Sequence, residues 1–203
     1  MKDKSMILPI VAYGAPVLKT KCKPIDADYP ELDELIENMF ETMYGANGLG
    51  LAAPQVGLPI RLFIVDTAPF ADNNDDLSKE ERKTFLNFKK VFINAEILEE
   101  TGEEWDFNEG CLSIPDIRED VTRKPEMTIR YLDENFKEHT ETYDGLIARV
   151  IQHEYDHIEG VLFTDKLSSF KKRLIKGKLN KISQGKIDTY YPMRFPTPSR
   201  KRR

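Results

Sequence analysis

Two histidines and one glutamate in the C-terminal half of the chain have the spacing of a metal-binding helix. Residues His153, Glu154 and His157 form an H-E-x-x-H pattern. Helical residues four apart project about 40° from each other, so both imidazoles can reach a single ion. Glu154 lies beside them, where a carboxylate can exchange protons with a water on that ion. The pattern therefore indicates a divalent metal that acts together with water.

The alternative is a pair of hydrogen-bonded core histidines. Two of the chain's three histidines occur at this spacing with a carboxylate between them. Burial of these groups without a metal would cost free energy, which favours the metal site.

A tetrahedral site needs a third protein ligand, and the residues alone leave it open. The extended metalloprotease pattern is excluded because Phe163 stands where its third histidine belongs. His139 lies in a polar, strand-like segment and is predicted to be a surface residue. Cys22 is predicted to be structural or incidental. Cys111 follows Gly110, which would allow close backbone approach to a metal or substrate, but a small buried hydrophobe is an equal alternative.

A helix must carry the H-E-x-x-H pattern, and the sequence predicts one over residues 144–159. Asp144 is a suitable N-cap and Gly160 a suitable C-terminal stop. Apolar residues spread around most of its circumference, so we expect this helix to be buried on most sides.

The remaining elements must form the scaffold around that helix. An amphipathic helix is predicted over residues 31–44 and a basic helix from about 165 to 182. Strands are predicted at residues 6–12, 60–66, 91–98, 127–132 and 137–143, with loops at 45–55 and 67–83. This order favours an α+β domain in which antiparallel β-sheets pack around the central helix that carries the pattern, followed by a C-terminal helix.

Composition indicates one globular domain in a reducing compartment. The chain has 203 residues, a net charge of -5 and two cysteines. No segment reaches the eighteen or so apolar residues of a membrane span, and no signal-peptide cleavage pattern follows residues 6–12. Two distant cysteines do not suggest a disulfide framework, and a thiol used for chemistry suits the cytoplasm.

The C-terminal end differs from the rest of the chain in charge. Residues 166–203 contain 13 Lys/Arg and a single acid, Asp188, which leaves the first 165 residues at -17. We therefore predict a domain over residues 1–185 and a basic tail over 186–203. Residues 199–203 are expected to be a solvated, disordered end; the alternative is contact with nucleic acid or an acidic surface.

Three motifs resemble the signature motifs of peptide deformylases. They are Gly-Leu-Gly-Leu-Ala-Ala-Pro-Gln at 48–55, Glu-Gly-Cys-Leu-Ser at 109–113 and Gln-His-Glu-Tyr-Asp-His at 152–157, in the order that the family has. The resemblance extends from about residue 7 to 180. It implies a hydrolase that removes the N-formyl group from the N-terminal methionine of newly synthesised proteins and releases formate.

The resemblance also implies a set of site residues. Cys111, His153 and His157 would bind one divalent ion, with Fe²⁺ expected and Zn²⁺, Ni²⁺ or Co²⁺ as substitutes. Glu154 would take the proton of the attacking water and deliver it to the departing amine. The Gln55 amide and the backbone N–H of Leu112 would stabilise the oxyanion. The implied substrate contacts are Leu49, Gly50, Leu146 and Val150, with Arg118 near the entrance.

Two departures from the family pattern leave questions open. The polar segment of residues 68–90 is longer than in compact members, so it is either a lid or a bystander. Arg149 replaces an apolar side chain of many relatives and lies, by helical phase, at the edge of the pocket face. The implied substrates are formyl-methionyl nascent chains. Because these chains emerge from the ribosome, we also predict that Lys171, Lys172, Arg173 and Lys176 of the basic C-terminal segment contact ribosomal RNA. The protein is expected to be a monomer.

Two other functions compete with this hypothesis. A general zinc peptidase would need a third His or Glu ligand, which is not recognisable. A ribosome-associated binding protein with the same fold would have no need of Glu154.

Overall fold

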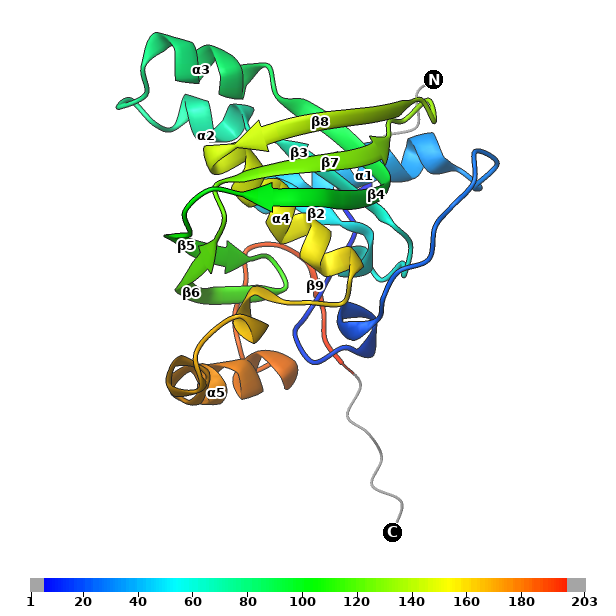
Figure 1. Cartoon of the computed structure of the whole chain (residues 1–203). Coiled ribbons are helices and arrows are strands. Elements are labelled where there is room, and N and C mark those ends of the chain that lie inside the picture. Colours follow the sequence, from blue (N-terminus) through cyan, green and yellow to red (C-terminus); the bar gives the residue numbers. More distant parts are fainter. Residues whose placement is uncertain (1–5, 197–203) are drawn as a thin grey trace.

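The computed structural model describes residues 6–196, and its largest element is an antiparallel sheet (Figure 1). Five strands follow the order β2-β3-β4-β7-β8, so β2 is one edge of the sheet. Their bounds are β2 Gly50–Ala52, β3 Leu62–Asp66, β4 Lys89–Thr101, β7 Glu126–Leu132 and β8 Glu138–Asp144. The predicted strands at 60–66, 91–98, 127–132 and 137–143 all belong to this sheet.

Helices cover both faces of the sheet, and strand alternation assigns each face its core. In β3, Leu62 and Ile64 pack with α1 (Leu32–Gly45), whereas Phe63 and Val65 pack with α4 (Gly145–Ile158). Because both faces are covered, every residue of β3 is buried. The predicted helices at 31–44 and 144–159 are thus confirmed.

The opposite side of α4 faces a hairpin that the sequence did not predict. Strands β5 (Trp105–Cys111) and β6 (Ile114–Arg123) pair antiparallel below the helix. Helix α5 (Ser169–Ser183) covers the hairpin, with Ile175 and Leu179 in one core with β6 residues. Helix α4 therefore lies between the five-stranded sheet and the hairpin, which confirms the α+β fold with a central helix and a C-terminal helix.

Helix α4 ends in a Schellman motif three residues after His157. Gly160 has φ +75°. Its N–H donates a hydrogen bond to the His157 carbonyl, and the Val161 N–H donates to the Asp156 carbonyl. A β-carbon at Gly160 would lie 2.9 Å from the Lys19 backbone. Asp144 occupies the N-cap position as predicted, but its side chain makes no capping hydrogen bond within the described residues.

Two predicted loops contain regular structure. Residues 67–83 include α2 (Ala68–Asp72) and most of α3 (Lys79–Leu86), because Ser78 and Glu81 form a capping box that starts α3. Residues 45–55 include β2 and the start of a short 3₁₀ helix, η2 (Ala53–Val56).

Two other predicted elements are shorter than expected. The early strand, predicted at 6–12, is only β1 (Ile10–Val11). The basic helix, predicted from about 165, begins as α5 at Ser169, because Ser168 caps it after the 3₁₀ helix η3 (Phe163–Asp165). A further 3₁₀ helix, η1 (Pro16–Lys19), follows β1.

Residues 186–196, predicted to begin a basic tail, contact the domain. Strand β9 (Met193–Arg194) pairs in parallel with β1, and Tyr191 is buried. These contacts join distant parts of the chain, which a local composition of Lys, Tyr and Pro does not reveal. Residues 197–203, including the basic end at 199–203, lie outside the described residues.

No helix in the described part of the chain is long and apolar enough to cross a membrane.

Replacement of Gly160 by Ala tests how α4 is terminated. We expect it to lower the free energy of unfolding by about 1–3 kcal/mol, because an alanine at positive φ is strained and its β-carbon meets Lys19. The control is Gly177→Ala in α5, where no atom lies within 4 Å of the added carbon. That variant should be more stable by about 0.5–1 kcal/mol. Urea unfolding measures both, and equal effects would contradict the proposed strain.

Candidate metal centre

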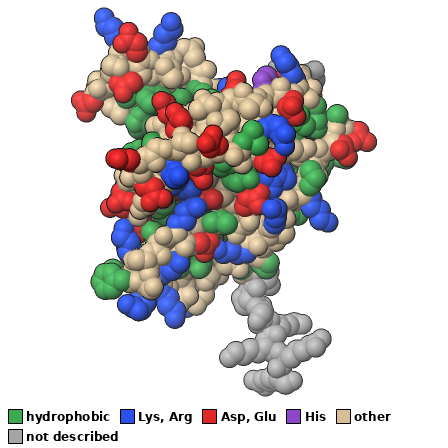
Figure 2. Space-filling model, in the orientation of Figure 1, with side chains coloured by type: hydrophobic (Ala, Val, Ile, Leu, Met, Phe, Trp, Pro, Cys, Tyr) green, Lys and Arg blue, Asp and Glu red, His purple; other side chains and the backbone are tan. Residues whose placement is uncertain are grey.

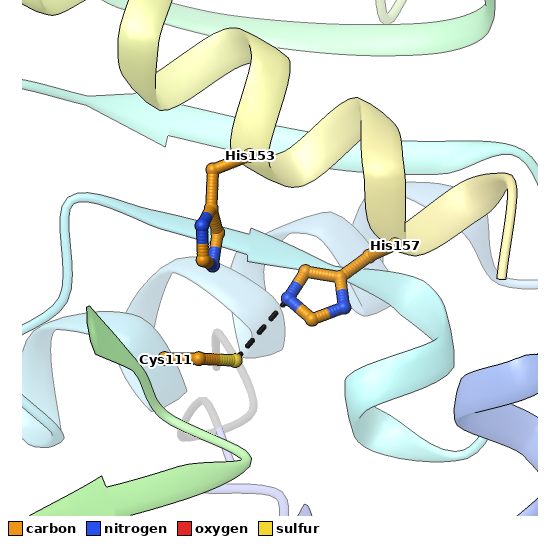
Figure 3. Close-up of side chains that lie close together, drawn as sticks. All are labelled: Cys111, His153 and His157. Atoms are coloured by element: carbon orange, nitrogen blue, oxygen red, sulfur yellow. Dashed lines mark hydrogen bonds between the residues drawn. The ribbon is translucent and has the colours of Figure 1, made fainter. Parts of the chain in front are cut away.

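The metal-binding pattern lies on the side of α4 that faces the hairpin. Ile147, Ile151 and Ile158 hold the other side of the helix against the sheet. This packing directs His153 and His157 toward the end of β5, where Cys111 lies (Figure 3). Sheet and hairpin together therefore determine where the two imidazoles meet the thiol.

Cys111, His153 and His157 form a candidate metal site. One ligand atom from each residue lies within 4.8 Å of the other two, and Cys111 Sγ is 3.3 Å from His157 Nε2. The ladder of β5 and β6 shifts register between Gly110 and Cys111. This irregularity belongs to the tight turn that presents the thiol to α4.

The donor set and its surroundings fit a borderline-soft divalent ion. One sulfur and two imidazole nitrogens suit several such ions and leave a position open for water. Glu154 is 4% exposed, and its Oε2 has no hydrogen-bond partner among residues 6–196. A buried carboxylate oxygen without a partner beside three metal donors is what a site completed by an ion and water would contain.

Glu109 orients His153 from the hairpin. Its Oε2 accepts a hydrogen bond of 2.9 Å from His153 Nδ1. An ionised carboxylate cannot donate a hydrogen bond, so His153 Nδ1 carries the proton. The other ring nitrogen, Nε2, is therefore the one that can bind a metal. Burial alone would raise the pKa of Glu109, but the bonds from His153 and Arg123 hold that pKa below its usual value.

Two arginines complete the environment of Glu109. Arg123 Nε donates to Glu109 at 2.7 Å and its Nη1 donates to Asp156 at 2.7 Å. Arg149 Nη1 donates to Glu109 at 3.0 Å, and its guanidinium lies 4.5 Å from the Trp105 ring centroid. Arg149 is 2% exposed. Arg149, predicted at the pocket edge, lines the cleft and acts on His153 through Glu109.

The two imidazoles differ in their ionisation. Burial lowers the pKa of His157 well below its usual value, so this ring is neutral and can bind a cation. Burial also opposes charge on His153, but its bonds to Cys111 and Glu109 raise its pKa well above the usual value. A bound cation takes the place of that proton, which couples metal binding to proton release.

The remaining predicted residues surround this cluster. Gln55 is buried, and its Oε1 accepts from the Ala52 N–H at 2.8 Å, so its amide NH₂ faces Cys111 Sγ at 3.5 Å. Burial raises the pKa of Glu154 to about 7. A β-carbon at Gly50 would lie 2.6 Å from this carboxylate. The lack of a side chain at Gly50 therefore makes room for Glu154, a reason that the sequence did not reveal.

One cleft of about 540 Å³ brings the predicted residues together. It is lined by all five predicted substrate contacts, Leu49, Gly50, Arg118, Leu146 and Val150. The three predicted catalytic residues, Gln55, Leu112 and Glu154, and two of the candidate metal ligands, Cys111 and His153, also line it. Residues that the sequence did not assign also line it, among them Phe70, Phe107, Tyr190 and Tyr191. Phe70 belongs to α2, so the inserted segment borders the cleft.

Two other candidate ligands lie elsewhere. Burial raises the pKa of Cys22 to about 11 and keeps its thiol protonated, and the side chain packs in the core between α4 and the sheet. His139 lies in β8, the edge strand opposite β2, and pairs with Asp133. Neither lies in the Cys111, His153 and His157 cluster.

The fold and the site define a metal-dependent hydrolase, in which a buried glutamate accompanies a Cys/His₂ donor set. A family model described as polypeptide deformylase matches residues 7–173. The chain belongs to this family, and it is therefore an enzyme that removes the N-formyl group from nascent peptides.

Individual relatives agree with this assignment. A peptide deformylase of Christiangramia forsetii is 66% identical over 97% of this chain and 100% of its own length. A peptide deformylase of Flavobacterium psychrophilum is 65% identical over 94% of this chain and 97% of its own. The crystal structure of a peptide deformylase from Legionella pneumophila superposes with a TM-score of 0.75 at 35% identity, covering 89% and 98% of the two chains.

Replacement of Glu109 by Gln tests its support of His153. Glutamine keeps the shape but loses the charge, so we expect metal affinity to fall by about 10–100-fold. The control is Glu119→Gln, directly opposite on β6 and partly exposed, which should keep the wild-type affinity. Competition with a chromogenic chelator measures both. Unchanged affinity in Glu109→Gln would show that the carboxylate charge does not act on the metal site.

Proposed function

We propose that Glu154 is the proton carrier of deformylation and that Cys111, His153 and His157 hold the metal. The buried Glu154 carboxylate beside the Cys/His₂ cluster carries this proposal, because its raised pKa suits a group that accepts and returns a proton near neutral pH. Glu154 takes a proton from the attacking water and delivers it to the amine that leaves the formyl carbon.

We assign the metal as Fe²⁺, with Zn²⁺, Ni²⁺ or Co²⁺ as functional substitutes. When bound, a divalent ion supplies a Lewis acid that polarises the formyl group and lowers the pKa of water. The chain contributes a thiolate, a neutral His157 and a His153 ring oriented by Glu109. A thiolate next to ferrous iron is open to oxidation, which makes the enzyme sensitive to oxygen.

Two donors are assigned to the oxyanion that forms on the formyl oxygen. Gln55 Nε2 is directed toward Cys111 by the bond from Ala52 to its carbonyl oxygen. The backbone N–H of Leu112 follows the metal-binding cysteine directly. Donors held in place before the reaction stabilise developing charge without reorganisation, and each contributes about 2.7–4 kcal/mol in comparable sites.

The substrate is proposed to bind as an added strand along β2. This strand is an edge of the sheet, so its outer side can pair with an extended peptide at Gly50. Leu49, Leu146 and Val150 line the cleft and would receive the methionine side chain. Arg118 is held at the cleft by its bond to Asn108 and marks the entrance.

The enzyme is proposed to act as a cytoplasmic monomer that docks on ribosomal RNA through α5. Figure 2 shows Lys and Arg side chains over α5 beside exposed hydrophobic atoms. Phe170 and Leu174 are more than 60% exposed on this helix. Of the four predicted cations, Lys171 and Lys172 bond to backbone carbonyls of the domain. Arg173 and Lys176 are exposed and are the candidates for phosphate contacts.

Replacement of Glu154 by Gln tests the proton transfer. The variant should bind metal as the wild type does but release formate from formyl-Met-Ala-Ser at least about 100-fold more slowly, because glutamine cannot take a proton. An anaerobic formate assay with metal analysis measures both, and the acetylated peptide serves as control. Near wild-type turnover by Glu154→Gln would overturn the role of Glu154. If the metal-loaded wild type released no formate, the assignment of formyl-methionyl peptides as substrates would be wrong.

Replacement of Arg173 and Lys176 by Gln tests ribosome docking. We expect weaker ribosome binding and a salt dependence that is less steep by roughly 1–2 in log–log slope, because two phosphate contacts are lost. Turnover of formyl-Met-Ala-Ser should not change. The control is Lys79→Gln with Lys83→Gln on α3, which removes the same charge from another exposed helix. Equal ribosome affinity of the two double variants would argue against docking through α5.

A further inference from the structure

The segment after α5 returns to the cleft and is fixed there. In Figure 1 it rises from α5 to β9 beneath α4. The Ile10 N–H donates to the Pro192 carbonyl and the Ala12 N–H to the Arg194 carbonyl, both at 2.9 Å. Two consecutive tyrosines, Tyr190 and Tyr191, precede this pairing and line the cleft. The pairing of β9 with β1 therefore holds both tyrosines at the active site.

Tyr191 contacts the backbone of the turn that follows the metal-binding cysteine. Its side chain is 8% exposed and packs in the core that contains α1. Its hydroxyl donates a hydrogen bond of 2.8 Å to the Leu112 carbonyl. The next carbonyl, that of Ser113, accepts from the Tyr13 N–H at 2.8 Å. Two successive peptide groups of this turn are thus held from outside the hairpin.

The bond from Tyr191 acts on Leu112, the residue whose N–H is assigned to the oxyanion. The Leu112 carbonyl shares a peptide plane with the Ser113 N–H, and the Leu112 N–H belongs to the preceding plane. An anchored carbonyl therefore restricts the Leu112 N–H through the φ and ψ dihedrals at one α-carbon. Without the hydroxyl, this carbonyl would have to turn toward another donor. Such a turn would move the Leu112 N–H away from the oxyanion position.

Tyr190 has a different environment. It is 70% exposed, but its hydroxyl donates to the Ala46 carbonyl at 2.8 Å and accepts from Asn47 Nδ2 at 3.3 Å. Ala46 and Asn47 precede the Gly48–Gly50 stretch of the cleft wall. The Tyr190 ring also borders an adjoining hollow of about 310 Å³. It therefore stands where the cleft continues away from the metal site.

We propose that this tyrosine pair completes the deformylase site. Tyr191 is a positioning residue that aligns the Leu112 N–H, and Tyr190 packs against the residues that follow formylmethionine in the peptide. The proposal rests on the oxyanion role assigned to Leu112 and on a peptide that runs along β2. An extended chain that leaves Gly50 along Leu49 and Gly48 reaches the Tyr190 ring next.

Tyr191→Phe tests the positioning role, because it removes one hydroxyl and keeps the ring. We expect kcat for formyl-Met-Ala-Ser to fall about tenfold, with KM changed by less than about twofold and metal content unchanged. Tyr29→Phe, remote from the cleft, is the control and should match the wild type. A fall in stability with an unchanged kcat, or a rise in KM alone, would overturn the role of Tyr191.

A parallel variant separates this test from the proposed function. Gln55→Leu removes the other oxyanion donor and should lower kcat about 10²–10³-fold. If Gln55→Leu is slow and Tyr191→Phe is not, the oxyanion site stands and the positioning role fails. If metal-loaded wild type releases no formate, the proposed function itself fails.

Tyr190→Ala tests the substrate contact. We expect KM for formyl-Met-Ala-Ser to rise about three- to tenfold, whereas KM for formyl-methionine amide, which lacks later residues, should change by less than about twofold. Tyr190→Phe keeps the ring and should restore most of the tripeptide affinity. Equal effects on the two substrates, or no effect on the tripeptide, would overturn the contact.

Discussion

The structure depends on one buried carboxylate, Glu109, and on the cations that neutralise it. A charge at 4% exposure is stable only with partners on several sides, and here they come from β6 and α4. The carboxylates of Glu109 and Asp156 pair with Arg123 and Arg149, and Lys166 also pairs with Asp156, so the network needs no charge from His153. The same contacts join the hairpin to the central helix. The position of Cys111 relative to both histidines follows from this ionic network.

The central helix shows how far sequence patterns could determine the site. The spacing of His153, Glu154 and His157 and the stop at Gly160 are local features, so both were predictable from a single segment. The third ligand was not, because Cys111 approaches them only through the pairing of β5 and β6. The alternation of polar and apolar residues that marks a strand is broken in β5 by Glu109, which is buried. Its hydrogen-bond partners lie 14, 40 and 44 residues away in the sequence, so the segment alone does not reveal them.

Long-range contacts also explain the remaining errors. Residues 186–196 have the composition of a tail, but a two-residue strand pairs them with β1 at the other end of the chain. The buried Tyr191 also joins them to Leu112. The inserted segment at 68–90 is polar by composition, yet Phe70 and Phe85 pack edge to face beneath its helices. In both places a few apolar side chains determine the structure, and a sliding average of polarity hides them.

If the substrate pairs with the edge of β2 as proposed, this edge limits when a new protein can be processed. An edge strand pairs only with a chain that is itself extended and has unused backbone groups. An N-terminus that has already entered a helix or a sheet of its own has neither. The opportunity for the reaction therefore closes as the first residues of the new protein fold. On the proposed binding along β2, competition between enzyme and folding, as well as affinity, would decide which proteins keep their formyl group.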